Sequence, residues 1–365
     1  MKKTSREELS IFWDYLGAHK PFSGLHTHIS SLEEALLARG LKPKFLGKNN
    51  FFYEKLLALP LSKITCPHYS SFLMRQGSCK KRNGKNIFHS FANINTDFLY
   101  PLRGNFYRVL TVHDVIPLLA KNKVSFLSYL QFKFCLKASL ERADRVICVS
   151  PWTKKCLGKL YPEFSEKCEV VLNGYTKHKK ISPELKLKRN TPVRLLSVSR
   201  YEPYKGFEKA LDILKGNSSF HLTFVTNPSG ISFLTRLGKE KGVLHRLCLY
   251  KNLGAKDLES EYKKSDVYLC TSEYEGYGLP AIDAISYGVP VVYQEGHALS
   301  DFLKEGSSYA LSPKASVTEW INGLTRALEL PLQSNTFFKS VEQTLSPLPS
   351  WDEVGKKVLG IYQSL

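Results

Sequence analysis

The sequence has 365 residues, of which 43% are apolar and 23% are charged, and this globular composition excludes a disordered, collagen-like or coiled-coil chain. At roughly 100 to 200 residues per domain, the length predicts two domains. The formal net charge is +19, and residues 1–170 hold most of it, with 27 Lys and Arg against 13 Asp and Glu, so the N-terminal half is expected to attract phosphate groups.

The first half of the chain alternates short apolar segments, typical of buried parallel strands, with helical segments. Such strands are predicted at residues 10–15, 86–91, 108–113, 145–150 and 169–173. Apolar residues at helical spacing between Ile29 and Leu36 predict a helix that ends before Gly40. Ser150 and Pro151 are typical of a helix N-terminus, so another helix is expected directly after the fourth strand.

The second half repeats this alternation after a polar, basic segment, residues 177–192, which is typical of an interdomain linker. Strands are predicted at residues 194–199, 221–226, 247–253, 266–270 and 289–293, and helices around residues 205–215, 231–241, 257–265 and 279–287. Two such arrays predict an α/β fold with two facing Rossmann-like, doubly wound domains, residues 1–176 and 193–348. Ligands are then expected at the carboxyl ends of strands and in an interdomain cleft. Residues 349–365 are expected to form a C-terminal helix that could pack back on the first domain.

The segment after the predicted strand at 266–270 has the features of an anion-binding loop. The loop and the start of the following helix consist of Glu275, Gly276, Tyr277, Gly278 and Leu279. Backbone N–H groups at this helix N-terminus are suited to bind phosphate. Asp283 follows Glu275 by eight residues, and both carboxylates could face one crevice and accept hydrogen bonds from sugar hydroxyls. The alternative is a Gly-rich connection with two solvated acids.

Two cations follow another predicted buried strand. Arg200 stands just after the strand at 194–199, and Lys205 is at the start of the next helix. An arginine fork and a lysine point charge at a strand end can together hold a diphosphate. A basic surface turn is the alternative. His113, which ends the strand at 108–113, is either a site residue or a satisfied polar group at a strand end.

The sequence resembles a known family, the retaining nucleotide-sugar glycosyltransferases of family four, which have the GT-B architecture. The similarity extends from about residue 11 to residue 292, with the motifs in the family's order. The matching segments are residues 22–24 (FSG), 111–117 (TVHDVIP), 143–150 (ADRVICVS), 171–174 (VLNG), 199–206 (SRYEPYKG), and 275–280 (EGYGLP) with 288–292 (GVPVV). Six motifs in register are far more specific than any one of them.

The resemblance implies a role for each matching residue. Arg200 and Lys205 would neutralise the donor's diphosphate, and Glu275 would bind hydroxyls of the donor sugar. Asp283 stands where the family has a second Glu and would contact the ribose. The remaining implied donor contacts are the backbone N–H groups of Tyr277, Gly278 and Leu279, the side chain of His113, and the first loop at Gly24. His26 and His28 follow Gly24 and could reach the acceptor. Ser23 and Ser199 replace glycines that the family usually has.

The function implied by the resemblance is the transfer of a hexose, with mannose as one candidate, from a nucleoside diphosphate sugar to a hydroxyl of a glycan or lipid-linked acceptor, with retained anomeric configuration. The pathway expected is cell-surface polysaccharide or lipopolysaccharide synthesis. No cofactor and no metal are expected, because the sequence has no DxD motif. The alternative is a GT-B-shaped sugar-nucleotide isomerase or an inactive nucleotide-sugar binder. No nucleic-acid partner is expected, because no RRM, KH or zinc-finger signature occurs.

The sequence contains no apolar segment of about 20 residues and no secretory signal, and none of its eight cysteines forms a CxxC pair. A cytoplasmic protein is therefore expected, with a possible peripheral place on the inner face of the membrane. Two basic clusters favour an anionic membrane surface as a partner, although a solvated surface is the alternative. They are Lys80, Lys81, Arg82 and Lys85 in a loop, and Lys121, Lys123, Lys133 and Lys137 beside Phe126, Leu127, Leu130 and Phe134 on an amphipathic helix.

Overall fold

The computed structural model describes residues 9–14, 24–46, 84–91, 93, 105–176 and 192–365. The chain divides into two compact units. The first unit contains the chain up to Gly174 together with Pro349–Leu365, and the second contains Tyr175–Leu348. Three residues of the first basic cluster, 80–82, and most of the predicted linker, residues 177–191, lie outside the described residues.

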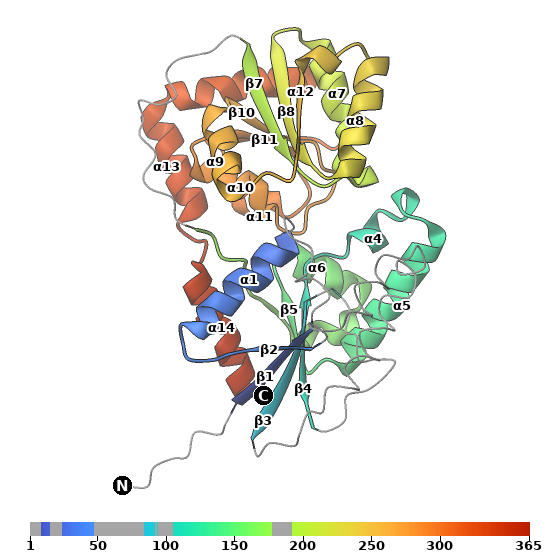
Figure 1. Ribbon diagram of the computed structural model, residues 1–365, viewed down its shortest axis with the longest axis vertical. Coiled ribbons are helices and arrows are strands. Elements are labelled where there is room, and N and C mark those ends of the chain that lie inside the picture. Colours follow the sequence, from blue (N-terminus) through green and yellow to red (C-terminus); the bar gives the residue numbers. More distant parts are fainter. Residues whose placement is uncertain (1–8, 15–23, 47–83, 92, 94–104, 177–191) are drawn as a thin grey trace. The chain divides into compact units, whose positions relative to one another are not determined.

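The first unit contains a six-stranded parallel sheet with the strand order β2-β1-β3-β4-β5-β6 (Figure 1). Its strands are β1 (Leu9–Asp14), β2 (Lys44–Leu46), β3 (Lys85–Ser90), β4 (Tyr107–Val112), β5 (Arg145–Cys148) and β6 (Cys168–Val170). The helices among its described residues are α1 (Gly24–Leu37), α4 (Ile116–Leu119), α5 (Phe126–Arg142), α6 (Pro151–Leu160) and α14 (Trp351–Ser364), with short 3-10 turns at Lys121–Lys123 and Pro162–Lys167. The strand order reverses between β1 and β3, which is the doubly wound arrangement.

One basic residue expected in a loop belongs to this sheet instead. Lys85 is the first residue of β3, and its Nζ donates to the carbonyl oxygen of Gln363 at 3.0 Å. The prediction placed it in a loop because of its basic neighbours, whereas pairing of β3 with β1 extends the strand to this position.

Both faces of this first sheet are buried, because neighbouring side chains along a strand point to opposite faces. On β4, Val109 packs with α1 and α14, whereas Leu110 packs with α5 and α6. On β5, Ile147 packs with α1 and α14, whereas Val146 packs with α5 and α6. Helices α1 and α14 therefore cover one face of the sheet and α5 and α6 the other (Figure 1). This explains why the strands appear in the sequence as continuous apolar runs.

The second unit contains another six-stranded parallel sheet, with the order β12-β11-β10-β7-β8-β9 (Figure 1). Its strands are β7 (Val193–Val198), β8 (Phe220–Thr226), β9 (Leu247–Lys251), β10 (Val267–Cys270), β11 (Val291–Gln294) and β12 (Ser308–Leu311). Its helices are α7 (Phe207–Gly216), α8 (Pro228–Glu240), α9 (Ala255–Lys264), α10 (Leu279–Ser286), α11 (Leu299–Phe302), α12 (Val317–Glu329) and α13 (Ser334–Leu345), with 3-10 turns at Pro203–Lys205, Leu244–Arg246 and Leu330–Leu332.

Alternation also buries both faces of the second sheet. Leu195 of β7 belongs to the core formed with α7, α8 and α12, whereas the next residue, Leu196, belongs to the core formed with α10 and α13. The predicted α/β fold with two parallel, Rossmann-like sheets is therefore confirmed. Strands β2 and β12 and helices α12 and α13 were not predicted. Strand β2 has only three residues, too few for a period-2 pattern to emerge.

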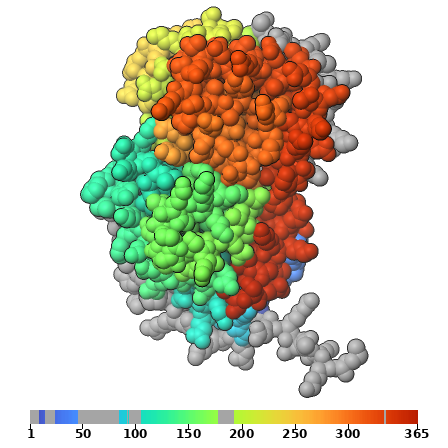
Figure 2. Space-filling view, turned by 180° about the vertical axis from the view of Figure 1, so that it is seen from behind, coloured from blue at the N-terminus to red at the C-terminus, as the bar shows by residue number. Residues whose placement is uncertain are grey.

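The last helix, α14, completes the first unit although it comes at the end of the chain. Val354, Val358 and Ile361 enter the core around Trp13 of β1. Lys357 Nζ also donates to the Val170 carbonyl oxygen of β6 at 2.7 Å, and Figure 2 shows this helix, in red, against the green segment that ends the first part of the chain. The two ends of the sequence thus fold into one unit.

Candidate functional site

The site of the second unit is built from loops that follow adjacent strands. Parallel strands end at the same edge of a sheet, and β7 pairs directly with β10, which pairs with β11. The loop after β7 carries Arg200 and Lys205, and the loop after β10 carries Glu275. Residues about seventy positions apart in sequence can therefore meet at one edge.

Lys205 and Glu275 form the central contact of this site. Lys205 Nζ lies 2.7 Å from Glu275 Oε1, and the two side chains are 15% and 16% exposed. Burial by itself raises the pKa of the Glu275 carboxyl, but the charge and hydrogen bond of Lys205, helped by a hydrogen bond from Ser272, outweigh it and hold this pKa below its usual value. The structure thus provides a largely buried, ionised carboxylate paired with a lysine.

Glycine at position 206 allows the two loops to approach each other. Gly206 has φ +67°, and a Cβ atom there would collide with the carbonyl oxygen of Thr271. Thr271 Oγ1 donates to the Lys205 carbonyl oxygen at 3.1 Å, and the backbone N–H of Glu273 donates to the Tyr204 carbonyl oxygen at 2.9 Å. A side chain at position 206 would separate the loops, so this glycine is needed for the Lys205–Glu275 contact.

Helix α10 begins at this same place, as the sequence predicts. Gly278 is its N-cap residue and has φ +88°, and a Cβ atom there would collide with the side chain of Leu299. The preceding loop residues are Gly276 and Tyr277, and Tyr277 is buried. The positive end of the helix dipole therefore lies in the loop that carries Glu275, where an anion is favoured.

Asp283 lies in the middle of α10 and is half-buried. Burial raises the pKa of its carboxyl to about 7. Within the described residues, its carboxylate has no hydrogen bond or ion pair. A poorly solvated carboxylate without a partner gains the most from a hydroxyl donor, which is the role that the resemblance implies for it.

Arg200 is exposed, and its guanidinium contacts no charged group within the described residues. It lies two residues beyond the end of β7, and its neighbour Tyr201 is fixed because its backbone N–H donates to Asn227 Oδ1 at 3.0 Å. Asn227 also caps α8 by accepting from the Gly230 N–H. The structure therefore holds the backbone beside Arg200 and leaves its side chain available to a ligand, but it does not bring Arg200 into the Lys205–Glu275 pair.

His297 belongs to the same cluster, although it was not among the predicted site residues. It follows β11 and is 1% exposed, and the adjacent Ala298 N–H donates to the Glu275 carbonyl oxygen at 3.2 Å. Burial lowers the pKa of His297 to about 4, and the charge of Glu275 opposes this shift only in part. Its place after a third adjacent strand end is the signal that could have found it.

The first unit contains a separate cluster of histidines at the carboxyl edge of its sheet. His28 of α1 and His113, directly after β4, have ring centroids 5.0 Å apart and nearly perpendicular planes. His28 Nδ1 bonds to Asn173 Oδ1 at 2.7 Å. Burial lowers the pKa of His28 to about 4 and that of His113 well below its usual value. His113 Nε2 is buried and has no hydrogen-bond partner within the described part of the chain.

The other two residues predicted near this cluster are more accessible. Gly24 is exposed at the start of α1, and His26 is half-buried two residues along the helix. Only His28 of the two predicted acceptor-side histidines therefore lies beside His113. Because its Nδ1 already bonds to Asn173, His28 is also suited to hold the position of α1 relative to the end of β6.

A buried polar network behind these histidines was not predicted. His89 bonds to Tyr362 at 2.6 Å and to Thr111 at 2.7 Å, and Asp14 accepts hydrogen bonds from Ser90 and from the backbone of Phe91. Burial raises the pKa of Asp14 to about 7 against the effect of those hydrogen bonds. Tyr362 comes from α14, so the network joins residues that no local sequence pattern connects.

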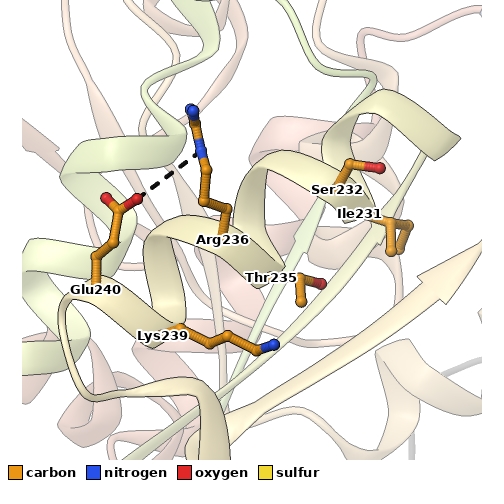
Figure 3. A pocket seen from close by; sticks show the side chains of 6 residues that line it. All are labelled: Ile231, Ser232, Thr235, Arg236, Lys239 and Glu240. Carbon is orange, nitrogen blue, oxygen red and sulfur yellow. Dashed lines mark ion pairs between the residues drawn. The ribbon is translucent and has the colours of Figure 1, made fainter.

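Other kinds of site are not found among the described residues. They contain no group of three or more His, Cys, Asp or Glu side chains that could hold a metal ion, and no helix there is long and apolar enough to cross a membrane. Figure 3 shows a hollow on α8 lined by Ile231, Ser232, Thr235, Arg236, Lys239 and Glu240. All six come from one helix, and Arg236 pairs with Glu240 at 4.0 Å, so the hollow lacks the convergent polar groups of a binding site.

Two family models match the chain, one on each half. Glycosyltransferase Family 4 matches residues 22–177, and Glycosyl transferases group 1 matches residues 179–343. The O-antigen chain mannosyltransferase RfbU of Salmonella typhimurium is 26% identical over 216 residues, and the match spans 59% of each protein.

Solved structures resemble the whole chain at low sequence identity. Sucrose-phosphate synthase from Thermosynechococcus elongatus has a TM-score of 0.77 and 17% identity, with 98% of this chain and 99% of that chain covered. HepE of Anabaena, solved with UDP-glucose, has a TM-score of 0.67 and 14% identity, with 98% and 100% covered. At this identity the likeness shows the fold alone.

Proposed function

Because the chain belongs to glycosyltransferase family 4 and has the GT-B fold, we propose that it is an enzyme that transfers a hexose from a nucleoside diphosphate sugar to a hydroxyl group of a glycan or lipid-linked acceptor. The observation that carries this proposal is the Lys205–Glu275 pair at the N-terminus of α10. It combines a cation and a helix dipole, which suit a diphosphate, with a carboxylate, which suits sugar hydroxyls.

The chemistry of such a transfer depends on the leaving group. Negative charge develops on the diphosphate as the glycosidic bond breaks, and Lys205, Arg200 and the α10 N-terminus can stabilise that charge. Glu275 would hold the sugar and Asp283 the ribose. The departing phosphate would accept the proton of the acceptor hydroxyl on the same face of the sugar, which retains the anomeric configuration. We propose that this reaction needs no metal ion, since the sequence has no DxD motif.

The sugar and acceptor are inferred from the relatives. RfbU is an O-antigen chain mannosyltransferase, which favours mannose as the sugar and a cell-surface polysaccharide or lipopolysaccharide as the product. HepE was solved with UDP-glucose, which supports a nucleoside diphosphate sugar as the donor class. Mannose transfer to a lipid-linked glycan is accordingly the specific form of the proposal.

The test is ligand binding followed by turnover. GDP, UDP and ADP are screened for a rise in melting temperature, since a ligand that binds only the native state stabilises it. The matching sugar nucleotide is then incubated with lipid-linked glycans, with and without EDTA. Formation of a glycosylated product, unchanged by EDTA, is expected. Binding without product would instead favour an inactive binder, and a rearranged sugar nucleotide would favour an isomerase.

Glu275→Gln tests the carboxylate itself. The substitution removes the charge at nearly constant volume, so the variant should fold and transfer sugar more than about tenfold more slowly than the wild type. The melting temperature and the initial rate are measured on the same preparation. Full activity in a folded Glu275→Gln variant would remove Glu275 from the site.

An acceptor attached to lipid requires the enzyme to reach a membrane, and α5 of the first unit has a suitable surface. Its exposed apolar residues are Phe126, Leu127, Leu130 and Phe134. Lys133 and Lys137 lie on the same side of the helix at 3.6 residues per turn, opposite the buried residues Cys135 and Ser139. We propose that this surface binds an anionic bilayer peripherally, with the apolar side chains at the headgroup boundary.

A further inference from the structure

His297 is connected to the Glu275 loop of the proposed site in two different ways. Its loop is held to the Glu275 loop by the Ala298 N–H, which donates to the Glu275 carbonyl oxygen at 3.2 Å. The imidazole itself lies close enough to both members of the Lys205–Glu275 pair for their charges to act on it. His297 therefore lies beside the groups that the proposed function assigns to the donor sugar.

The hydrogen bond at Nδ1 of His297 indicates which ring nitrogen carries the proton. Nδ1 accepts from the backbone N–H of Leu299 at 3.4 Å, so in the neutral ring the proton is on Nε2. Burial keeps the ring neutral at neutral pH, since it lowers the pKa to about 4 against smaller opposing effects of Glu275 and the Ser272 backbone.

The Nε2 atom is buried and has no hydrogen-bond partner within the residues that the structure describes. A buried donor left unpaired loses its hydration without a compensating hydrogen bond, which calls for a functional reason. A ligand that accepts from Nε2–H would supply one.

We propose that His297 is a specificity-determining residue whose Nε2–H donates a hydrogen bond to a hydroxyl of the donor sugar, the same hydroxyl that donates to Glu275. This inference rests on the proposed function and deepens it. A hydroxyl can donate and accept at once, so it can bridge a carboxylate and a neutral imidazole N–H. A phosphate oxygen cannot, because it accepts only and is repelled by the carboxylate.

The ion pair explains how the hydroxyl gains access to Glu275. Lys205 Nζ and Glu275 Oε1 are 2.7 Å apart, so the diphosphate of an incoming donor competes with Glu275 for Lys205. As Lys205 turns to the diphosphate, the carboxylate accepts the hydroxyl and His297 completes the second hydrogen bond. A sugar that lacks this hydroxyl leaves two buried groups unpaired, which is the most effective way for a site to reject an analogue.

The experiment compares nucleotides with and without the sugar. Dissociation constants are measured by calorimetry for UDP, UDP-glucose, GDP and GDP-mannose with the wild type, His297→Leu and His297→Gln. His297→Leu should bind the sugar nucleotide at least about tenfold more weakly and the nucleoside diphosphate within about twofold of the wild type. His297→Gln keeps an N–H near the position of Nε2 and should recover much of the loss. His245→Gln, an exposed histidine of the same unit, is the control and should bind both like the wild type.

Other outcomes overturn the assignment. If the wild type and His297→Leu bound UDP-glucose or GDP-mannose with equal affinity, the assignment would be wrong. If His297→Leu lost affinity equally for the nucleotide and the sugar nucleotide, His297 would have a structural role instead. If the Leu variant does not fold, monodeoxy sugar nucleotides are tested on the wild type, and equal affinity for all of them is the contradicting result. Failure of the wild type to bind any of the four ligands would overturn the proposed function first, and this inference with it.

Discussion

Lys205 has two partners: it pairs with a buried carboxylate in the structure, and it would bind the diphosphate in the proposed reaction. Its ammonium is mostly buried and already faces Glu275. Lys205→Ala or Arg200→Ala should weaken nucleoside diphosphate binding by about 1.5 to 3 kcal/mol, which is the scale of a hydrogen bond to a charged group. Calorimetric titration with the nucleotide found in the screen measures this loss.

Lys241 offers a matched control for the Lys205 substitution. Its Nζ lies 2.5 Å from Asp212 Oδ1, and its side chain is 19% exposed, so Lys241→Ala removes a comparable ion pair from the same unit. Nucleotide affinity should stay unchanged in that variant. If Lys241→Ala weakened binding as much as Lys205→Ala, or if both Arg200→Ala and Lys205→Ala bound normally, the diphosphate site would be wrongly assigned.

The elevated pKa of Asp283 predicts that sugar-nucleotide binding depends on pH in a defined direction. Burial raises its pKa to about 7, so the carboxyl is largely protonated at pH 6 and ionised at pH 8. A ribose hydroxyl donates to the ionised form, and therefore affinity should rise as the pH increases through 7, by up to about tenfold between pH 6 and 8. UDP-glucose and GDP-mannose are suitable probes because their diphosphates do not titrate in this range.

Asp283→Asn is the control for that titration. It has no ionisable group at this position, so its affinity should be nearly constant from pH 6 to pH 8. A wild-type affinity that did not change with pH, or a variant that kept the full wild-type dependence, would separate Asp283 from ribose binding.

At the scale of elements, the site depends on loops that close contacts hold together. Gly206 lets the loop after β7 reach Thr271, and Gly278 lets α10 begin against Leu299. Both glycines have positive φ, where an L side chain is strained in any case. The strands bring the three loops to one edge, and these two positions set the spacing at which Lys205, Glu275 and His297 meet.

Helix α5 carries a prediction of its own. Phe126 and Phe134 are 75% and 67% exposed on one side of the helix, and Lys133 and Lys137 lie on the same side. The protein should therefore sediment with anionic vesicles and not with neutral ones, and 1 M salt should release it, because the Debye length falls to about 3 Å. Replacing Phe126 and Phe134 with Ser should weaken binding at low salt.

Charge reversal separates the α5 surface from general electrostatics. The double variant Lys133→Glu, Lys137→Glu should abolish vesicle binding. The double variant Lys154→Glu, Lys155→Glu changes the net charge equally, at exposed positions of α6, and should retain most of the vesicle binding. An equal loss in both double variants would mean that only the net charge matters. Equal sedimentation with both lipid types, or with neither, would return α5 to an ordinary solvated surface.

At the scale of the whole molecule, the end of the chain completes the unit in which the chain begins. Arg39 beside α1 pairs with Asp352 of α14 at 2.7 Å, and Tyr362 joins the buried network of His89 and Trp13. The close approach of the helices depends on Gly355, since a Cβ atom there would lie 2.7 Å from the Cβ of Ala35. Removal of this helix would open the core of the first unit.

Two glycines of α14 test that packing. Gly355→Ala should lower the free energy of unfolding by about 1 to 3 kcal/mol, because the added methyl overpacks the contact with Ala35. A methyl group at Gly360, in the same helix, would have no atom within 4 Å among those described, so Gly360→Ala should raise stability by up to about 1 kcal/mol through helix propensity. Denaturant unfolding measures both, and the same sign for both variants would contradict the packing described.

The α/β class and the residues at strand ends could be predicted from local sequence patterns. Strands buried on both faces are continuous apolar runs, so β4, β5, β7 and β10 could be located from such runs in the sequence. Glu275, Lys205 and His113 were found because each follows such a run. Local patterns suffice wherever the physical cause, burial or a helix terminus, acts within a few residues.

Which of those residues meet, and in what electrostatic state, depends on the packing of the folded chain. The pairing of Lys205 with Glu275, the elevated pKa of Asp283 and the buried Nε2 of His297, which lacks a partner among the described residues, all arise from burial by segments distant in sequence. Strand β2 and the contribution of Tyr362 were not predicted, because three residues or one side chain give no periodic signal in the sequence. Desolvation and close approach are properties of the packed chain, and the linear sequence does not contain them.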